Sequence, residues 1–474
     1  MTGEAPSDVL WHYNLSARHL DKLCERVDTF SVSGDGERLV VRHRDDIIVV
    51  PSSHKVDDDD PACIRVDLTR LRRTVNPRAE WRQMFDENGR LMASHYWRED
   101  MNGVDWDGVL NRYRPLVDLC HVVDDLHDIL WETVAELNTS HSYVSASGAA
   151  GDSDMRAGLL GADVSSGADG AKVVRVIPGE SSDPRAWSPL RAAGVAVTEG
   201  DVIVAVDGRK VGADGNLGEL LEGSAGRVVE LTVHRGENER QVAVVPMADE
   251  APLRYHDWVA SRRRYVEEHS GGRLGYLHVP DMVSDGWAEL HRQIGEATRH
   301  EGVIADVRFN HGGHTSQLVV ERLARRVVGW DYSRWYATAD TYPQNAVRGP
   351  IVMVTNQWAG SDGDIVAAAT QAMGYAKVIG ERSWGGVVGI DGRFDLVDGT
   401  SVTPPRYAGW GGGYGWGVET RGVEADIVVT VSPEDWEADR DVQLDAAIAE
   451  CLRQLDDKPA ATAPELPGPA FGRC

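Results

Sequence analysis

The sequence predicts a multidomain α+β protein, and three observations support this fold class. The chain has 474 residues, which is too long for one ordinary hydrophobic core and indicates about three domains. Hydrophobic residues make up 42% and charged residues 26% of the chain, which is typical of soluble globular proteins. The hydrophobic period changes along the sequence from strand-like to helical, back to strand-like, and finally to strands that alternate with helices.

The first segment, residues 1–56, carries the strand-like period. Three such runs lie within residues 29–50, with turns at residues 34–36 and 44–46. This pattern resembles one blade of a β-propeller, which cannot bury both of its faces alone. The acidic run at residues 57–60 predicts a solvated break after it.

The second segment, residues 61–146, has helical spacing and predicts a small helical domain. Two apolar faces are expected to form its core, and they consist of Trp81, Met84 and Phe85 on one side and Leu116, Leu119, Val123, Leu126, Ile129 and Leu130 on the other. Polar turn residues follow the last helix. They place Ser140 and His141 at a helix-to-loop boundary.

The third segment, residues 155–250, follows a linker-like stretch at residues 148–154. Its strand-like runs include one over residues 200–211, where a Gly-Asp turn precedes an apolar strand. This order of strands resembles a PDZ domain. Such a domain holds an extended peptide by strand addition, with the loop near Leu160 and Gly161 facing the peptide carboxylate. A PDZ-like spacer with a closed groove is the alternative.

The fourth segment, residues 252–455, predicts an α/β domain with a largely parallel sheet. Expected strands at residues 274–279, 303–309, 351–355 and 376–380 alternate with expected helices at 285–299, 315–328 and 364–374, before a strand at 423–430 and a helix at 443–455. The tail over residues 456–474 is rich in Pro and Ala and is expected to be disordered.

Ser361 lies on the turn between the expected strand 351–355 and the following helix. Gly360 and Gly363 leave little bulk around its hydroxyl, which suits a nucleophile beside amides that bind an oxyanion. The alternative is a helix cap, since Ser361 is followed three residues later by Asp364. A nucleophile also needs a base, an orienting group and free amides.

Other segments offer candidates for the free amides, the base and the orienting group. A glycine-rich turn at residues 310–314 follows a strand, so Gly312 or Gly313 can supply an amide. Among the 16 histidines, His141 has polar neighbours and is the favoured base, whereas Lys377 is the lysine alternative. Glu419, in a loop crowded with glycine and aromatic residues, is a candidate to orient the base, unless it is a solvated loop glutamate.

The sequence predicts no metal and no cofactor. The five cysteines are scattered along the chain and show no paired metal-ligand spacing. His311 and His314 stand close together, but no acidic or cysteine partner follows at ligand spacing.

Together these segments resemble the tricorn protease family, a relative of the C-terminal processing peptidases. The motifs that carry the resemblance are Ser140-His141, Asn310-His-Gly-Gly313, Ala359-Gly-Ser-Asp-Gly-Asp364, Trp384-Gly-Gly-Val-Val-Gly389 and residues 417–426. The resemblance implies a ClpP/crotonase-like catalytic domain in which Ser361 is the nucleophile and His141 the base. It implies that Ser140 and Glu419 orient the imidazole, that Gly313 and Asp362 supply the oxyanion amides, and that Asp331 selects basic substrate side chains.

The resemblance also implies oligopeptide substrates, downstream aminopeptidases and a hexameric ring. Two features depart from the family. Its two propellers are represented by one blade, so the chain is either the C-terminal part of a longer protein or a shortened homologue. The loop around His311 and His314 is bulkier than an all-glycine turn, which leaves Gly312 and Gly313 both open as donors.

We therefore expect a serine peptidase that works through an acyl-enzyme intermediate. A catalytically idle scaffold that binds peptides through its PDZ-like domain is the first alternative. A peptidase that depends on Lys377 is the second.

The charge of the chain argues against two classes of partner. The formal net charge is −26 and the isoelectric point is about 5.0, so the protein would repel nucleic acid phosphates and anionic lipid. No apolar run reaches the length of a membrane span, and residues 1–6 do not resemble a secretory leader. The sequence therefore predicts a cytoplasmic protein that binds neither nucleic acid nor membrane.

Overall fold

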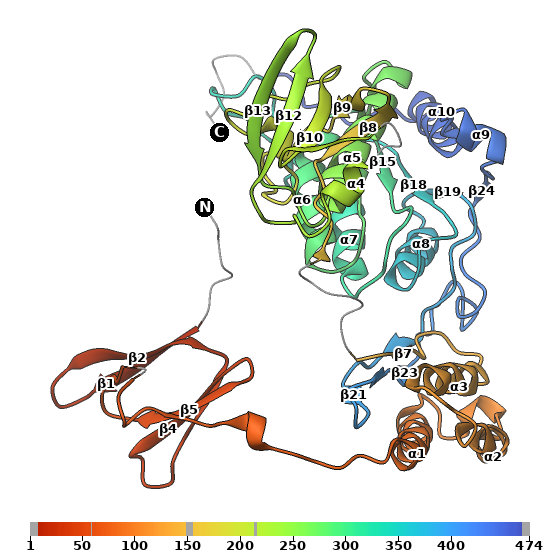
Figure 1. The fold of residues 1–474 in the computed structure, drawn as a ribbon. Coiled ribbons are helices and arrows are strands. Elements are labelled where there is room, and N and C mark those ends of the chain that lie inside the picture. The colour runs from red at the N-terminus through yellow and green to blue at the C-terminus, as the bar shows by residue number, and fades with distance from the viewer. Residues whose placement is uncertain (1–7, 58, 148–154, 213–215, 467–474) are drawn as a thin grey trace. The chain divides into compact units, whose positions relative to one another are not determined.

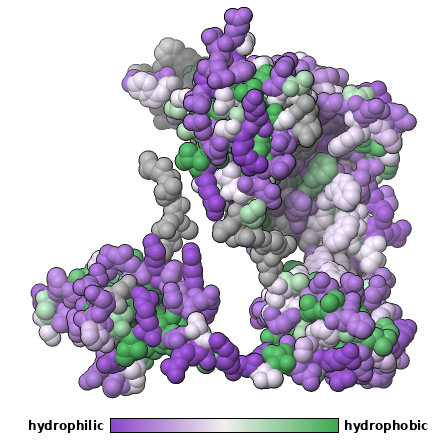
Figure 2. All heavy atoms as spheres, viewed as in Figure 1, coloured by the Kyte–Doolittle hydropathy of each residue, from purple (hydrophilic) through white to green (hydrophobic). Residues whose placement is uncertain are grey.

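The computed structural model describes residues 8–57, 59–147, 155–212 and 216–466. The chain forms two compact units that divide after Pro77, and the arrangement of the elements within each unit can be followed in Figure 1. Hydrophilic residues cover most of the visible surface in Figure 2, as expected from 75 acidic and 49 basic residues. Within the described residues, every helix is too short or too polar to cross a lipid bilayer.

The first unit is built from antiparallel strands. A two-stranded sheet pairs β1 (Asp8–Asn14) with β2 (His19–Val27), and a four-stranded sheet has the order β3 (Thr29–Val32), β4 (Arg38–His43), β5 (Asp46–Pro51) and β6 (Ile64–Arg65), followed by the 3-10 helix η1 (Leu68–Arg70). The first unit continues past the predicted break at residues 57–60, because β6 pairs with β5. Cys63 N–H donates to the Asp60 carbonyl at 2.8 Å, so the chain turns after Asp60 and returns to β5.

The second unit begins with helices α1 (Pro77–His95), α2 (Trp106–Val117) and α3 (Val123–Ala135), with the 3-10 helix η2 (Met101–Gly103) between α1 and α2. Met84, Phe85 and Leu126 are buried in their core, as predicted. The prediction is wrong for Leu116, Leu119 and Val123, which are 42%, 69% and 37% exposed. Leu116 lies in the last turn of α2 but not on its buried face, and Leu119 lies beyond the end of that helix at Val117.

The helical core is completed by chain from far along the sequence. Leu396 and Val402 are buried against the helices. Strand β7 (Val144–Ser145) pairs with β22 (Ser401–Val402), which also pairs with β21 (Phe394–Asp395). The helical region is therefore not the single continuous segment that the sequence predicts.

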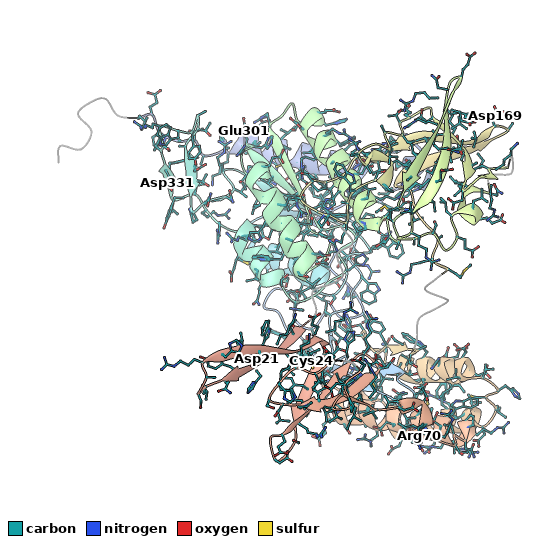
Figure 3. All side chains as sticks on the ribbon, turned by 60° about the vertical axis from the view of Figure 1, so that its left-hand side comes forward. Asp21, Cys24, Arg70, Asp169, Glu301 and Asp331 are labelled. Atoms are coloured by element: carbon teal, nitrogen blue, oxygen red, sulfur yellow. The ribbon has the colours of Figure 1, made fainter. Side chains whose placement is uncertain are left out.

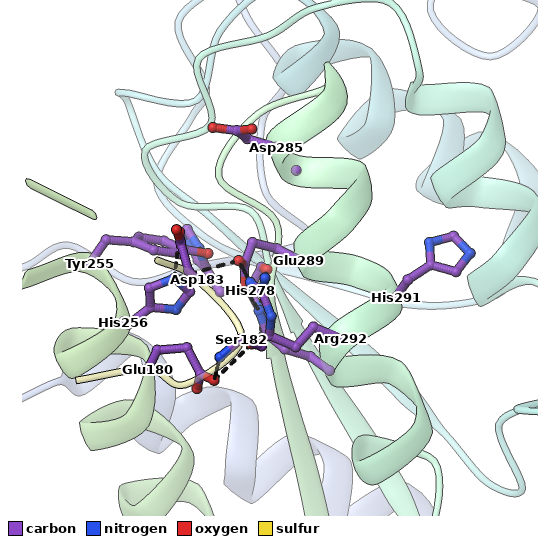
Figure 4. Close-up of polar contacts among 12 residues, drawn as sticks. Glu180, Ser182, Asp183, Tyr255, His256, His278, Asp285, Glu289, His291 and Arg292 are labelled. Carbon is purple, nitrogen blue, oxygen red and sulfur yellow. Dashed lines mark hydrogen bonds and ion pairs between the residues drawn. The ribbon is translucent and has the colours of Figure 1, made fainter. Parts of the chain in front are cut away.

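The β domain is an antiparallel sheet with the order β13-β12-β10-β9-β8. Its elements are β8 (Ala162–Gly167), β9 (Gly170–Val176), η4 (Pro189–Arg191), β10 (Val202–Val206), β11 (Arg209–Lys210), α4 (Leu217–Leu220), β12 (Val229–Arg235) and β13 (Asn238–Val244). Figure 4 shows its contact with the α/β domain, where His256 Nε2 lies 3.3 Å from Asp183 Oδ2 and 3.8 Å from Glu289 Oε1. These polar contacts fix the β domain to helices α5 (Ala251–His269) and α6 (Ser284–Ala297).

The α/β domain has a five-stranded parallel sheet with helices on both faces. Its order is β14 (Leu274–His278), β15 (Gly302–Asp306), β18 (Ile351–Thr355), β19 (Lys377–Gly380) and β24 (Ile427–Val428). Alternate strand residues enter different cores: Met353 packs in the core with helices α6, α7 (Ser316–Leu323) and α8 (Asp362–Met373), whereas Val352 packs in the core with α5 and α10 (Val442–Asp457).

The remaining short elements lie in loops of this domain. They are the hairpin of β16 (Gly329–Asp331) with β17 (Asp340–Tyr342), the antiparallel pair of β20 (Gly389–Ile390) with β23 (Pro405–Tyr407), and helix α9 (Pro433–Glu437). Residues 456 and 457 end α10, and Ala461 N–H bonds to the Arg348 carbonyl at 2.8 Å. The expectation of disorder from residue 456 is therefore wrong up to residue 466, because Arg348 gives this stretch backbone partners; residues 467–474 lie outside the described residues.

Candidate active site

Strand β18 and helix α8 position Ser361 on a strained turn. All five residues of β18 are buried, and Ser361 has φ 58° and ψ −120°, a conformation that costs energy for a residue other than glycine. Its hydroxyl makes no capping hydrogen bond to α8. The helix-cap interpretation is therefore wrong, and the hydroxyl is left for another use.

Two glycines let neighbouring loops approach this turn. A Cβ atom on Gly312 would lie 2.5 Å from Ser361 Cβ, and one on Gly360 would lie 2.6 Å from Trp384 Cε3. Both distances are too short for real side-chain atoms, so these positions accept only glycine. The loop of Gly312 and the ring of Trp384 thus pack directly against the Ser361 turn.

The amides near Ser361 divide into one that is used and two that are not. Gly312 N–H donates to Asn310 Oδ1 at 2.9 Å. Gly313 N–H and Asp362 N–H donate to no other residue in the described part of the chain. Asp362 is also the first residue of α8, where the helix dipole favours negative charge.

His141 follows α3, and hydrogen bonds hold both its imidazole ring and its backbone carbonyl. Its Nδ1 lies 3.1 Å from Ser140 Oγ, and its carbonyl accepts a bond from Thr403 Oγ1 at 2.6 Å. Ser140 Oγ donates to Glu419 Oε2 at 3.0 Å, so its lone pair can accept Nδ1–H of His141. This arrangement selects the tautomer in which Nε2 is unprotonated and can act as a base.

Glu419 is the hub of this network. Its carboxylate accepts the Ser140 N–H at 2.7 Å and the N–H groups of Val387 and Val388 at 2.8 and 3.0 Å. Burial lowers the pKa of His141, and the charge of Glu419 and the Val388 backbone oppose that shift. His141 is thus neutral near pH 7, as a general base requires.

Trp384 connects the two halves of the site. Its ring centroid lies 6.0 Å from that of His141 in an edge-on arrangement, and the backbone N–H of Trp384 donates to the Ala359 carbonyl at 3.0 Å. The same ring packs against Gly360. His141 and the Ser361 turn therefore lie against one indole, although no hydrogen bond joins the two side chains within the described residues.

Asp364 and Ser383 fix the position of Trp384. Asp364 is buried and accepts bonds from Ser383 Oγ at 2.5 Å and from Gly385 N–H at 2.8 Å. Burial raises the pKa of Asp364. The sequence singled out Asp364 only as a possible cap, and it gave no signal for Ser383, whose partners are distant along the chain.

Three family models match the chain: the tricorn protease C1 domain over residues 77–135, the tricorn protease PDZ domain over residues 158–249, and peptidase family S41 over residues 273–429. Tricorn protease homolog 1 of Streptomyces coelicolor is 56% identical over 98% of this chain and 44% of its own length.

The chain belongs to the tricorn protease family.

Two further tricorn relatives extend this finding. The tricorn protease of Thermoplasma acidophilum is 34% identical over 96% of this chain and 42% of its own length. A crystal structure of the tricorn protease matches with a TM-score of 0.87 at 33% identity, covering 94% of this chain and 43% of that chain. The chain thus spans less than half the length of these tricorn relatives.

The structure places the other predicted residues of this tricorn chain away from the Ser361 turn. Lys377 is exposed and pairs with Val352, near the start of β18, whereas Ser361 follows the end of that strand. Asp331 is exposed on the β16–β17 hairpin, at the outer edge of the α/β domain in Figure 3. Its role in substrate selection stays a prediction. Within the described residues, no group of His, Cys, Asp and Glu side chains could hold a metal.

Proposed function

We propose that this chain is the catalytic part of a serine peptidase that cleaves oligopeptides through an acyl-enzyme intermediate. The observation that carries this proposal is the Ser361 turn. A strained backbone presents a hydroxyl that caps no helix, beside the amides of Gly313 and Asp362, which donate to no other described residue. Unused donors beside an uncommitted hydroxyl suit an acyl-transfer site.

The mechanism follows from these groups. His141 Nε2 takes the proton of Ser361 Oγ as that oxygen attacks the peptide carbonyl carbon, and the Gly313 and Asp362 amides stabilise the oxyanion. The imidazolium then gives its proton to the leaving amine. Water hydrolyses the acyl-enzyme with His141 again acting as base. Ser140 and Glu419 hold the imidazole in the required tautomer.

The idle PDZ-type scaffold is less well supported. Gly161 N–H, which was predicted to face a peptide carboxylate, donates to Glu250 Oε2 at 3.2 Å. The Leu160 carbonyl accepts a bond from Ser188 Oγ at 3.0 Å. A carboxylate of the chain itself therefore takes the place that a bound peptide end would need.

A fluorophosphonate probe tests the proposal, because it labels only an activated serine. We expect one adduct, on Ser361, and no adduct in Ser361→Ala. Ser361→Ala should also lose at least about 10⁴-fold in turnover of blocked oligopeptides. Lys377→Ala is the matched control and should label normally. Undiminished turnover in Ser361→Ala, with the fold verified by circular dichroism, would exclude the nucleophile assignment.

Other features come from the resemblance and from the names of the relatives. We propose that the whole protein assembles as a hexamer, works in the cytoplasm, prefers basic side chains through Asp331, and passes its products to aminopeptidases. Sedimentation of the full protein and product analysis with a purified aminopeptidase would test the first and last of these.

A further inference from the structure

A cavity of about 520 Å³ opens at the carboxyl edge of the parallel sheet. Its lining comes from the segments that follow β15, β18, β19 and β24, which contribute Phe309, Trp358, Glu381 and Trp436, and from Trp258 of α5. Ligands of open α/β sheets usually bind at this edge. The proposed acyl transfer uses none of these side chains.

Aromatic rings form the walls of this cavity. The rings of Trp258 and Phe309 meet at 81° with centroids 6.2 Å apart. Trp358 and Trp436 are 64% and 77% exposed, so their faces are available to a ligand. The faces of tryptophan rings attract cations.

The cationic residues at the cavity already have partners. Arg308 Nη2 and Nη1 lie 2.7 and 2.8 Å from the carboxylates of Asp306 and Asp441, and Arg440 lies 2.7 Å from Asp435. Arg262 lies 3.2 Å from Asp441. An anionic ligand would have to compete with these carboxylates.

The Glu381 side chain differs from these arginine side chains in its polar partners. Its Oε2 accepts one long bond from Gln443 Nε2, at 3.4 Å. Within the described part of the chain, no Lys, Arg or His nitrogen forms an ion pair with it. A half-buried carboxylate without a counter-ion, among aromatic faces, favours a cationic ligand.

The cavity adjoins the proposed active site along two segments. Trp358 precedes Ser361 by three positions, and Glu381 precedes Trp384 by three positions; three residues span at most about 10 Å. Asn356 Oδ1 accepts the N–H groups of Phe309 and Trp358 at 3.0 and 3.2 Å. It thereby joins the loops that lead to the Gly313 and Asp362 amides.

We propose that this cavity binds a cationic group of an oligopeptide, with Glu381 as its counter-ion and Trp358 and Trp436 as its aromatic walls. The link to cleavage rests on the proposed function, whereas the binding itself does not. The cationic group is either a side-chain guanidinium or ammonium, or the ammonium at the amino end of the peptide. Glu381 would then select the substrate without taking part in the reaction.

Binding to the full chain carrying Ser361→Ala tests this inference without turnover. N-acetyl-arginine amide presents only the side-chain cation, leucine amide presents only the terminal ammonium, and N-acetyl-citrulline amide is the neutral reference. By titration calorimetry we expect one of the two cations to bind at least about tenfold more tightly than the reference. Glu381→Gln should remove that preference, and Trp358→Leu should weaken it.

Glu434→Gln is the matched control, since Glu434 is an exposed acidic residue of α9 that is not among the residues lining the cavity. If Glu381→Gln and Glu434→Gln weaken cation binding equally, the binding reflects only the overall negative charge of the protein. That result would overturn the inference. So would cation binding that Glu381→Gln leaves intact. No cation preference, together with a changed sedimentation coefficient in Glu381→Gln, would identify an interface between copies and also overturn it.

Failure of the peptidase proposal would look different. Glu381→Gln in the chain with Ser361 intact should react with fluorophosphonate at the unchanged rate, while kcat/KM for cationic peptides falls toward that for neutral ones. If the unaltered chain neither labels nor turns over, but cation binding still depends on Glu381, the peptidase proposal fails and the cavity assignment stands.

Discussion

Two glycine turns in this chain use the same backbone group in opposite ways. Gly161 in the β domain has φ 62° and Gly313 in the α/β domain has φ 144°. Gly161 N–H donates to Glu250 Oε2 at 3.2 Å, whereas Gly313 N–H donates to no residue in the described part of the chain. The first turn has a built-in acceptor, and the second keeps its donor available to a ligand.

Leaving the Gly313 N–H without an acceptor in the protein costs little free energy. A buried donor without an acceptor costs about 1–3 kcal/mol, but Gly313 is exposed, so water can satisfy its amide until a ligand arrives. The neighbouring Gly312 N–H is tied to Asn310 Oδ1 at 2.9 Å, which holds the turn in place. An open donor on a fixed turn is pre-organised for a developing negative charge.

The largest expected effect tests whether the open turn serves a reaction at all. His141→Ala should lower kcat for oligopeptide cleavage by roughly 10⁴-fold, because no other group would take the Ser361 proton. Kinetics on a blocked peptide measure this loss. His121→Ala, at an exposed histidine of the same helical region, is the control and should change kcat less than twofold. If His141→Ala lowers kcat by less than tenfold, His141 is not the base that acts at the open turn.

The second prediction addresses the open turn directly. In Gly313→Ala the new Cβ would lie 2.2 Å from the Met282 carbonyl oxygen, so the amide must move. We expect a loss of about 10²–10³ in kcat with a smaller change in KM, as when one oxyanion donor is removed. Gly218→Ala, which has open space at its Cβ position, is the control. If kcat holds while the protein stays folded, Gly313 does not bind the oxyanion.

Local signals predicted the turn that carries Ser361, the proposed nucleophile, but could not predict the residues that surround it. A buried strand, a glycine-rich turn and an Ala-rich helix predicted where Ser361 would lie, because these patterns are local. The contact of Asp364 with Ser383, and the ring of Trp384 between His141 and Gly360, join residues that are distant in sequence. No periodicity records such contacts.

The wrong expectations have a related cause. Apolar residues continued at helical spacing past Val117, so Leu119 was assigned to a core that the chain leaves there. The helical core is closed instead by Leu396 and Val402, and only tertiary packing brings these residues to the helices. The role proposed for Glu419 comes from the resemblance to a family, because composition alone left it open.

The third prediction concerns the pH dependence of the labelling rate, and the expected change in that rate at pH 7 is less than tenfold. Burial lowers the pKa of His141 below its usual 6.5, and only the neutral imidazole can take a proton. The fluorophosphonate labelling rate should therefore rise with pH, with a midpoint below about 6.5, and reach a plateau at higher pH. Trp384→Leu exposes the imidazole and should shift the midpoint upward. Lys377→Ala should leave the profile unchanged.

The same shift has a consequence for stability. Because the folded protein holds His141 neutral more firmly than the unfolded chain does, the unfolded state binds more protons below pH 6.5. The stability that His141 contributes is present above that pH and is lost as the pH falls toward the folded-state pKa. A labelling rate that does not fall as the pH drops below 6.5 would contradict His141 as the base.

The smallest expected effect tests the closed turn. Glu250→Ala removes the acceptor of Gly161 N–H and should lower the free energy of unfolding by about 1 kcal/mol, measured by urea denaturation. It should also let the β domain bind a pentapeptide with a free carboxylate more tightly than its amidated form, at millimolar concentration. Glu268→Ala, at an exposed position of the same helix, is the control. If Glu250→Ala changes neither stability nor carboxylate preference, the Gly161 turn is not closed by Glu250, and an unused amide at Gly313 would no longer distinguish the two turns.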